Sequence, residues 1–190
     1  MLLGAAAGML LAAPVFMPAS YSWIAHTTSE SAAQGIDHAW IARTGLALMA
    51  AGVMTVTWSA RSEWNTLTLI AHTAFALSMA GAAVFSAAPW FDAAFERTED
   101  MLHSVFAGAM GVAFAIGVVS SIFDDHGDRR RVRAVDVAAV VASVAVPLAM
   151  FNLAVVAGVL QRIMFAIAFW WYGVAGSHHV RSSRLPVSPV

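Results

Sequence analysis

The sequence predicts an all-α protein: a polytopic transmembrane helical bundle of six spans with both termini in the cytoplasm. Apolar residues make up 60% of the 190 residues and charged residues only 11%, whereas a soluble domain carries about 25% charged residues. The apolar residues gather in stretches of about 20, the length that crosses roughly 30 Å of hydrocarbon as a helix. This composition excludes a soluble enzyme and a nucleic-acid-binding domain.

The first apolar stretch covers residues 2–17 and stops at Pro14 and Pro18. Because no Lys or Arg precedes it, we interpret it as a span and not as a signal peptide. The next three spans are predicted at residues 40–60, 64–87 and 101–123.

The apolar stretch of residues 134–176 is too long for one span and long enough for two. We divide it near residues 152–156 and expect Pro147 to kink the fifth span near its end. The six spans then form one transmembrane domain, residues 1–176, and the polar residues 177–190 form a short disordered tail.

The placement of arginines predicts the orientation, because all ten basic residues other than histidine are arginines. Seven of them lie on the same side of a six-span chain as the N-terminus: Arg61, Arg129, Arg130, Arg131, Arg133, Arg181 and Arg184. The positive-inside rule makes that side cytoplasmic. We therefore expect a multi-pass protein of the plasma (inner) membrane.

Aromatic and histidine residues near the spans have structural explanations. Aromatic side chains near span ends are expected at the membrane interfaces, and these are Trp64, Trp90, Trp170, Trp171 and Tyr172. His72 stands alone inside the third span, which favours a hydrogen-bonded core histidine over a ligand.

Polar residues from three distant segments meet at the outer face in this topology. They are His26, Ser29 and Glu30 after the first span, Glu99, Asp100 and His103 at the start of the fourth, and Arg162 in the sixth. Glu99, Asp100 and His103 share one helix face by their spacing. A carboxylate beside an imidazole can orient it as a base or a metal ligand. The acids can equally complement the helix dipole, with Thr98 or Asp100 as the cap.

Arg162 is the most informative single residue. An arginine inside a span costs about 2.5–3.5 kcal/mol on insertion scales, so it usually pairs or faces the bundle interior. We expect a buried ion pair with Glu30 first and Asp100 or Glu99 next, because a guanidinium suits a carboxylate. Snorkelling to the interface and binding of a ligand are the alternatives. The first loop is then expected to pack against the outer ends of spans four and six.

The outer-face motifs resemble a known family. The motifs are Tyr21-Ser22 followed by His26-Thr27-Thr28-Ser29-Glu30, then Glu99-Asp100 with His103, and Gln161-Arg162. They resemble those of the bacterial domain-of-unknown-function 998 membrane proteins. The resemblance implies six spans and a His-x-x-Ser-acid loop after the first span. It implies no particular activity, because the family has none established.

Two classes of function fit these residues best, and a transporter is a third class that the charge-poor interior disfavours. The first, which we favour, is a non-enzymatic membrane protein whose outer polar cluster binds a membrane lipid, a small ligand or a protein partner, including a second copy of the chain. The second is an intramembrane lipid hydrolase that uses the same carboxylates and holds a metal through His26, His38 and His103. The sequence has no HExxH or GxSxG motif and no cysteine, so we expect no cofactor.

Overall fold

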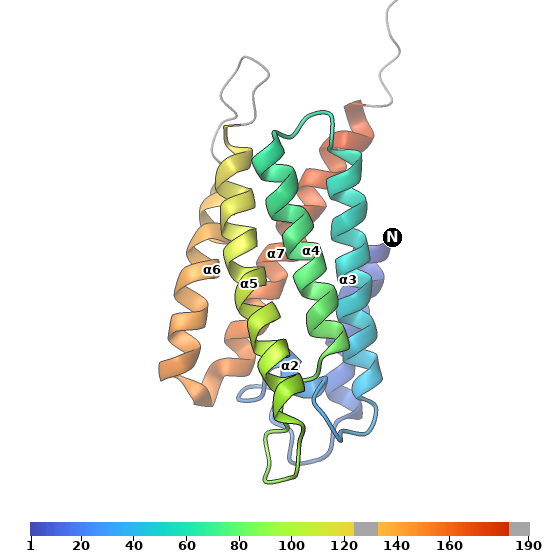
Figure 1. The fold of residues 1–190 in the computed structure, drawn as a ribbon, viewed down its shortest axis with the longest axis vertical. Coiled ribbons are helices and arrows are strands. Elements are labelled where there is room, and N and C mark those ends of the chain that lie inside the picture. The colour runs from blue at the N-terminus through green and yellow to red at the C-terminus, as the bar shows by residue number, and fades with distance from the viewer. Residues whose placement is uncertain (124–132, 183–190) are drawn as a thin grey trace, which may run out of the picture.

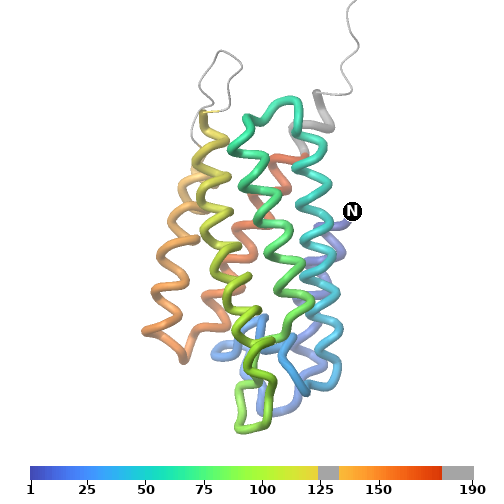
Figure 2. Tube along the Cα trace, in the orientation of Figure 1, coloured from blue at the N-terminus to red at the C-terminus, as the bar shows by residue number. Residues whose placement is uncertain are grey.

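The computed structural model describes residues 1–123 and 133–182, and it shows long helices lying side by side (Figure 1, Figure 2). Within these two ranges the chain is helical and has no strand, which confirms the predicted fold class. The helices are α1 Leu2–Ala12, α2 Thr28–Ser31, α3 Ala39–Ser59, α4 Thr66–Val84, α5 Arg97–Ser121, α6 Ala134–Asn152 and α7 Ala157–Ser182, with 3-10 turns at Ala13–Phe16 and Ala154–Val156.

Among the described residues, five helices are long and apolar enough to cross a membrane, and these are α3 to α7. The break between the last two lies at the 3-10 turn Ala154–Val156, where the sequence predicts it. Pro147 stays inside α6. α7 continues to Ser182, past the expected end of the domain at Gly176, and residues 183–190 lie outside the described part of the chain. The chain is a multi-pass helical membrane protein.

The first expected span is shorter than the others. Helix α1 and its 3-10 turn cover Leu2–Phe16, about 25 Å of helix, against the roughly 30 Å of a hydrocarbon core. It starts partway along the bundle (Figure 1) and packs along α3. The contact is close because α3 has Gly45 and Gly52 there. A Cβ at these glycines would lie 2.6 Å from Leu10 and 2.7 Å from Leu3, respectively.

The connections between helices sort to two ends of the bundle (Figure 1). Helix α2, the α4–α5 connection and the α6–α7 turn lie at one end, which we call the α2 end. The α3–α4 connection, the start of α6 and the end of α7 lie at the opposite end. Arg61 and Arg133 are therefore at the opposite end, while Arg97 is at the α2 end. Four of the arginines used for the orientation, Arg129, Arg130, Arg131 and Arg184, lie outside the described residues.

The core contains two residues that the sequence assigned to the membrane interface. Trp171 and Tyr172 are 1% and 0% exposed, so the interfacial prediction is wrong for both. Both residues lie on the buried face of α7, and the Trp171 Nε1 and the Tyr172 hydroxyl each have a hydrogen-bond partner. The Tyr172 hydroxyl lies 2.7 Å from Nδ1 of the buried His72, which confirms His72 as a hydrogen-bonded core histidine. Trp170, by contrast, stays exposed.

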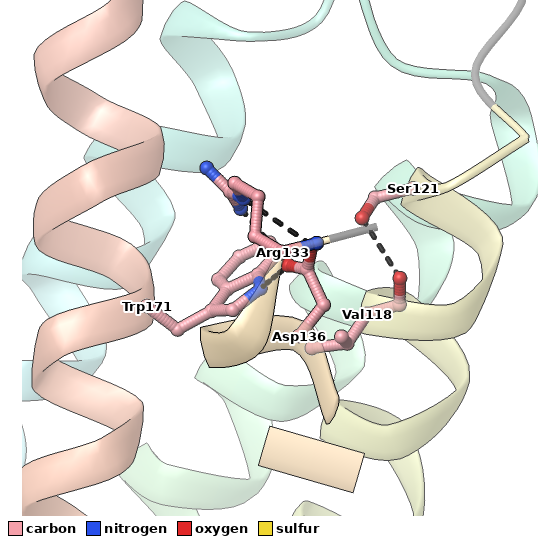
Figure 3. A network of polar contacts seen from close by, with 5 residues as sticks. All are labelled: Val118, Ser121, Arg133, Asp136 and Trp171. Atoms are coloured by element: carbon pink, nitrogen blue, oxygen red, sulfur yellow. Dashed lines mark hydrogen bonds and ion pairs between the residues drawn. The ribbon is translucent and has the colours of Figure 1, made fainter. Parts of the chain in front are cut away.

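A buried carboxylate fixes the start of α6 against α7 (Figure 3). Asp136 is fully buried and accepts a hydrogen bond from Nε1 of Trp171 at 2.8 Å. It also pairs with the Arg133 guanidinium at 2.9 Å and accepts from the Arg133 backbone N–H. Nearby, the hydroxyl of Ser121 donates to the Val118 carbonyl of α5. The polar residues at this opposite end of the bundle therefore have a structural role: they hold the start of α6 against α7.

Candidate functional site

The first loop at the α2 end folds around a short helix with a complete cap. The Oγ1 of Thr27 accepts from the Glu30 N–H at 3.1 Å, and a carboxylate oxygen of Glu30 accepts from the Thr27 N–H at 2.6 Å. This reciprocal pair is the capping box of α2. Glu30 is therefore used within its own loop.

Arg162 holds this loop against α7, but through other groups than the sequence predicts. Its Nη1 donates to the carbonyls of Trp23 and His26 at 2.8 and 2.9 Å, and its Nη2 donates to the Tyr21 hydroxyl at 2.6 Å. The guanidinium also lies 4.6 Å from the centre of the Trp23 ring. The predicted ion pair with Glu30, Asp100 or Glu99 is wrong: within the described residues, the guanidinium contacts oxygen dipoles and an aromatic face.

The neighbours of Arg162 on α7 complete the attachment. Oε1 of Gln161 accepts from the backbone N–H groups of Thr28 and Ser29 at 2.7 and 3.3 Å, and its amide donates to the Ser29 hydroxyl. The N–H of Gly158 donates to the Ala25 carbonyl. A Cβ at Gly158 would collide with the carbonyl of His26. Of the prediction that the first loop packs against the outer ends of spans four and six, these contacts confirm the part about span six, and glycine at 158 permits the approach.

Aromatic rings join the first loop to the α4–α5 connection. The His26 ring lies 5.4 Å from the Tyr21 ring and 5.1 Å from the Trp90 ring. Nδ1 of His26 accepts from the Ser22 N–H at 2.8 Å. Burial raises the pKa of the Tyr21 phenol above its ordinary value, while the neighbouring Arg162 guanidinium opposes that rise. Tyr21 therefore acts as a neutral hydrogen-bonding group between Arg162 and the loop.

Glu99, Asp100 and His103 share one face of α5, as predicted, and all three bind the backbone that leaves α4. Glu99 accepts from the Ser86 N–H and Asp100 from the Ala88 N–H, both at 2.8 Å. Nδ1 of His103 lies 2.9 Å from the carbonyl oxygen of Phe85. The predicted caps of this helix are wrong, because the N-cap is Glu96, whose carboxylate accepts from the Thr98 N–H.

The three histidines of the proposed metal site do not come together. His38 is exposed at the start of α3, in the left-handed conformation with φ 63°, and His26 and His103 are engaged as described above. Across the described residues, no group of three or more His, Asp or Glu side chains is placed to hold a metal ion. The structure therefore gives the metal-dependent alternative no ligand set.

A cavity of about 590 Å³ lies beneath the polar residues, between α5, α6 and α7. Its wall is rich in methionine and phenylalanine: Met79, Met110, Met150, Met164, Phe151 and Phe165. Its polar lining comes from Thr27, Ser29, His103, Ser104, Ser143 and Gln161. None of the lining residues, all of which are in the described part of the chain, is charged. Of the predicted cluster, Ser29 and His103 thus reach the cavity, while Arg162, Glu99 and Asp100 support the loops around it.

Two residues outside the predicted cluster are central to it. Gln161 belongs both to the loop anchor and to the cavity lining. Gln34 joins the two loops: its amide donates to the carbonyls of Ser86 and Glu96, and its Oε1 accepts from the Glu96 N–H. Gln161 could have been found from the sequence, because it stands beside an arginine inside a span. Gln34 could not, because a single glutamine in a loop gives no signal of a structural role.

The chain matches the model of a known protein family. A family model described as "Protein of unknown function (DUF998)" matches residues 2–178, which is nearly the whole chain and includes every residue of the outer cluster. No curated protein matches the chain, and no solved structure does.

Proposed function

The chain belongs to the DUF998 family of proteins of unknown function, and we propose that it binds a membrane lipid or another small apolar molecule in the cavity between α5, α6 and α7. The cavity carries this proposal. Its volume of about 590 Å³ lies within the usual range of roughly 300–1,000 Å³ for ligand sites. An apolar wall with a few polar groups is also the usual composition of such sites.

The wall favours a flexible, apolar occupant. Four methionines and two phenylalanines line it, and methionine side chains adapt to irregular apolar shapes. The cavity lies among helices that cross the membrane, so acyl chains of the surrounding lipid are the most abundant apolar groups within reach. A membrane lipid is therefore the first candidate.

We place the protein in the plasma membrane with the α2 end outside. Support comes from Arg61 and Arg133 at the opposite end, together with the arginine-rich sequence between α5 and α6. The cavity would then lie at the level of the outer leaflet. No observation favours a protein partner, a second copy or the metal-dependent hydrolase, so the proposal includes none of them.

The experiment fills the cavity and measures lipid retention. Gly108 lines the cavity, and a Cβ there would meet no atom within 4 Å. Gly108→Phe therefore adds a ring at the cavity wall without a clash at its Cβ, and is designed to fill the cavity. Gly173 is equally open but lies on the exposed face of α7, away from the cavity, so Gly173→Phe is the matched control.

The parent and both variants are purified from membranes in mild detergent and examined by native mass spectrometry. We expect a retained lipid on the parent and on Gly173→Phe, and its loss from Gly108→Phe. Equal retention by parent and Gly108→Phe, or a parent that carries no lipid after incubation with a total membrane-lipid extract, would overturn the proposal.

A further inference from the structure

His103 is the polar side chain of the cavity whose hydrogen-bonding role is incomplete. It is 4% exposed, and its Nδ1 lies 2.9 Å from the carbonyl oxygen of Phe85. A carbonyl oxygen can only accept, so Nδ1 carries the proton. In the neutral ring, Nε2 then presents a lone pair and can only accept a hydrogen bond.

This acceptor has no partner in the described part of the chain. Nε2 of His103 is buried and makes no hydrogen bond there. A buried polar atom without a partner destabilises a protein, so such atoms usually receive a hydrogen bond from protein, water or ligand. His103 is also one of the residues that line the cavity. A molecule in the cavity thus lies beside this residue and can supply the missing donor.

The charges around the cavity limit the kind of head group. No Asp, Glu, Lys or Arg is among the lining residues that the structure describes. Ionic groups in the structure around the cavity are already engaged: Arg162 with Tyr21 and two carbonyls, and Glu99 and Asp100 with backbone N–H groups. An ionised head group would enter a low-dielectric site without a counter-charge, which is unfavourable.

We propose that the ligand is an uncharged amphiphile with a free hydroxyl, of the acylglycerol or long-chain alcohol class. Its hydroxyl donates to Nε2 of His103, and its hydrocarbon chain lies along the methionine-rich wall. The inference rests on the proposed lipid-binding function and adds to it the chemistry of the head group.

The test compares ligands that share a long unbranched hydrocarbon chain and differ in the head group. The probes are 1-hexadecanol, its methyl ether 1-methoxyhexadecane, and palmitate, bound to the delipidated protein and counted by native mass spectrometry. The variant is His103→Asn, because the asparagine amide can still donate to the Phe85 carbonyl in place of Nδ1 but leaves no acceptor at the position of Nε2. Its thermal midpoint, measured beside the parent, reports whether the fold is kept.

We expect the parent to bind the alcohol about tenfold more tightly than the ether, the effect of one hydrogen bond to a buried acceptor. His103→Asn should lose that preference, with a thermal midpoint close to that of the parent, and Gly173→Phe should keep it. Equal binding of alcohol and ether by the parent, or tightest binding of palmitate, would overturn the inference. If the alcohol and the ether bind the parent equally and both are lost from Gly108→Phe, the inference about the head group fails and the proposed lipid-binding function stands. If none of the three probes binds the parent and the parent also retains no membrane lipid, both proposals fail.

Discussion

The guanidinium of Arg162 donates to the hydroxyl of Tyr21 at 2.6 Å, across 141 residues of sequence. The same hydroxyl donates to the carbonyl of Thr27 at 2.8 Å. Tyr21 therefore links Arg162 of α7 by hydrogen bonds to Thr27, the residue that caps α2. The arginine is satisfied by oxygen dipoles, which is sufficient to offset part of the insertion cost of a charge in a span.

Replacing Arg162 by lysine should destabilise the protein. A lysine ammonium has three donors on one atom and cannot reach the Trp23 and His26 carbonyls and the Tyr21 hydroxyl from two separate nitrogens, as the guanidinium does. We expect a loss of about 2 kcal/mol or more of unfolding free energy, since hydrogen bonds to charged groups contribute about 1.5–3 kcal/mol. The midpoint of denaturant unfolding in detergent measures it.

The control for that experiment is Glu30→Gln. Glutamine can keep the capping box of α2 while removing the charge, so we expect little change in stability. A loss as large as that of Arg162→Lys would show that the carboxylate does pair with the arginine, and would contradict the hydrogen-bond assignment given above.

Gly158→Ala should loosen the first loop. The added Cβ would collide with the His26 carbonyl and lie 2.8 Å from the Ile24 carbonyl, so the loop backbone has to move away from α7. We expect a lower thermal midpoint and faster proteolytic cleavage in the first loop. Gly173→Ala adds the same methyl to open space on the same helix and should leave both measurements unchanged.

The helices could be predicted from the sequence because hydrophobic length alone determines a span in lipid. The apolar stretch predicted to begin at residue 134 and to divide near residues 152–156 agrees with α6, Ala134–Asn152, and with the turn at Ala154–Val156. The faces of the helices could not be predicted in the same way. Trp171 and Tyr172 are of residue types that are common at membrane interfaces, and only the packing of α7 shows that they are buried.

The cluster at the α2 end was predicted in part. The spacing of Glu99, Asp100 and His103 placed them on one face correctly, because helical periodicity is local. Their partners are backbone groups of Phe85, Ser86 and Ala88, and backbone acceptors and donors carry no sequence signal. The partners of Arg162 were missed for the same reason. Its positive charge predicts a carboxylate partner, whereas in the structure its guanidinium donates to the backbone carbonyls of Trp23 and His26.

Single-cysteine labelling should show that the α2 end faces outward. The chain has no cysteine, so one introduced thiol gives the whole signal. Asp92 and Ser62 are both exposed, in the α4–α5 and α3–α4 connections at the two ends of the bundle. In intact cells, a membrane-impermeant maleimide should modify Asp92→Cys and leave Ser62→Cys unmodified until the cells are opened. The reverse pattern would invert the proposed orientation.

Trp171→Phe should destabilise the opposite end of the bundle. The change removes the Nε1–H that donates to the fully buried carboxylate of Asp136 at 2.8 Å, and a buried acceptor that loses a partner costs about 1–3 kcal/mol. Trp170→Phe changes the neighbouring exposed tryptophan and should alter stability by no more than about 0.5 kcal/mol.

Trp171→Phe also removes ring volume, so a double-mutant cycle with Asp136→Leu separates the loss of the hydrogen bond from the loss of packing. If the hydrogen bond matters, the double variant should lose less than the sum of the two single variants, because neither polar partner is then left behind. Strictly additive losses would mean that packing alone accounts for the effect of Trp171→Phe.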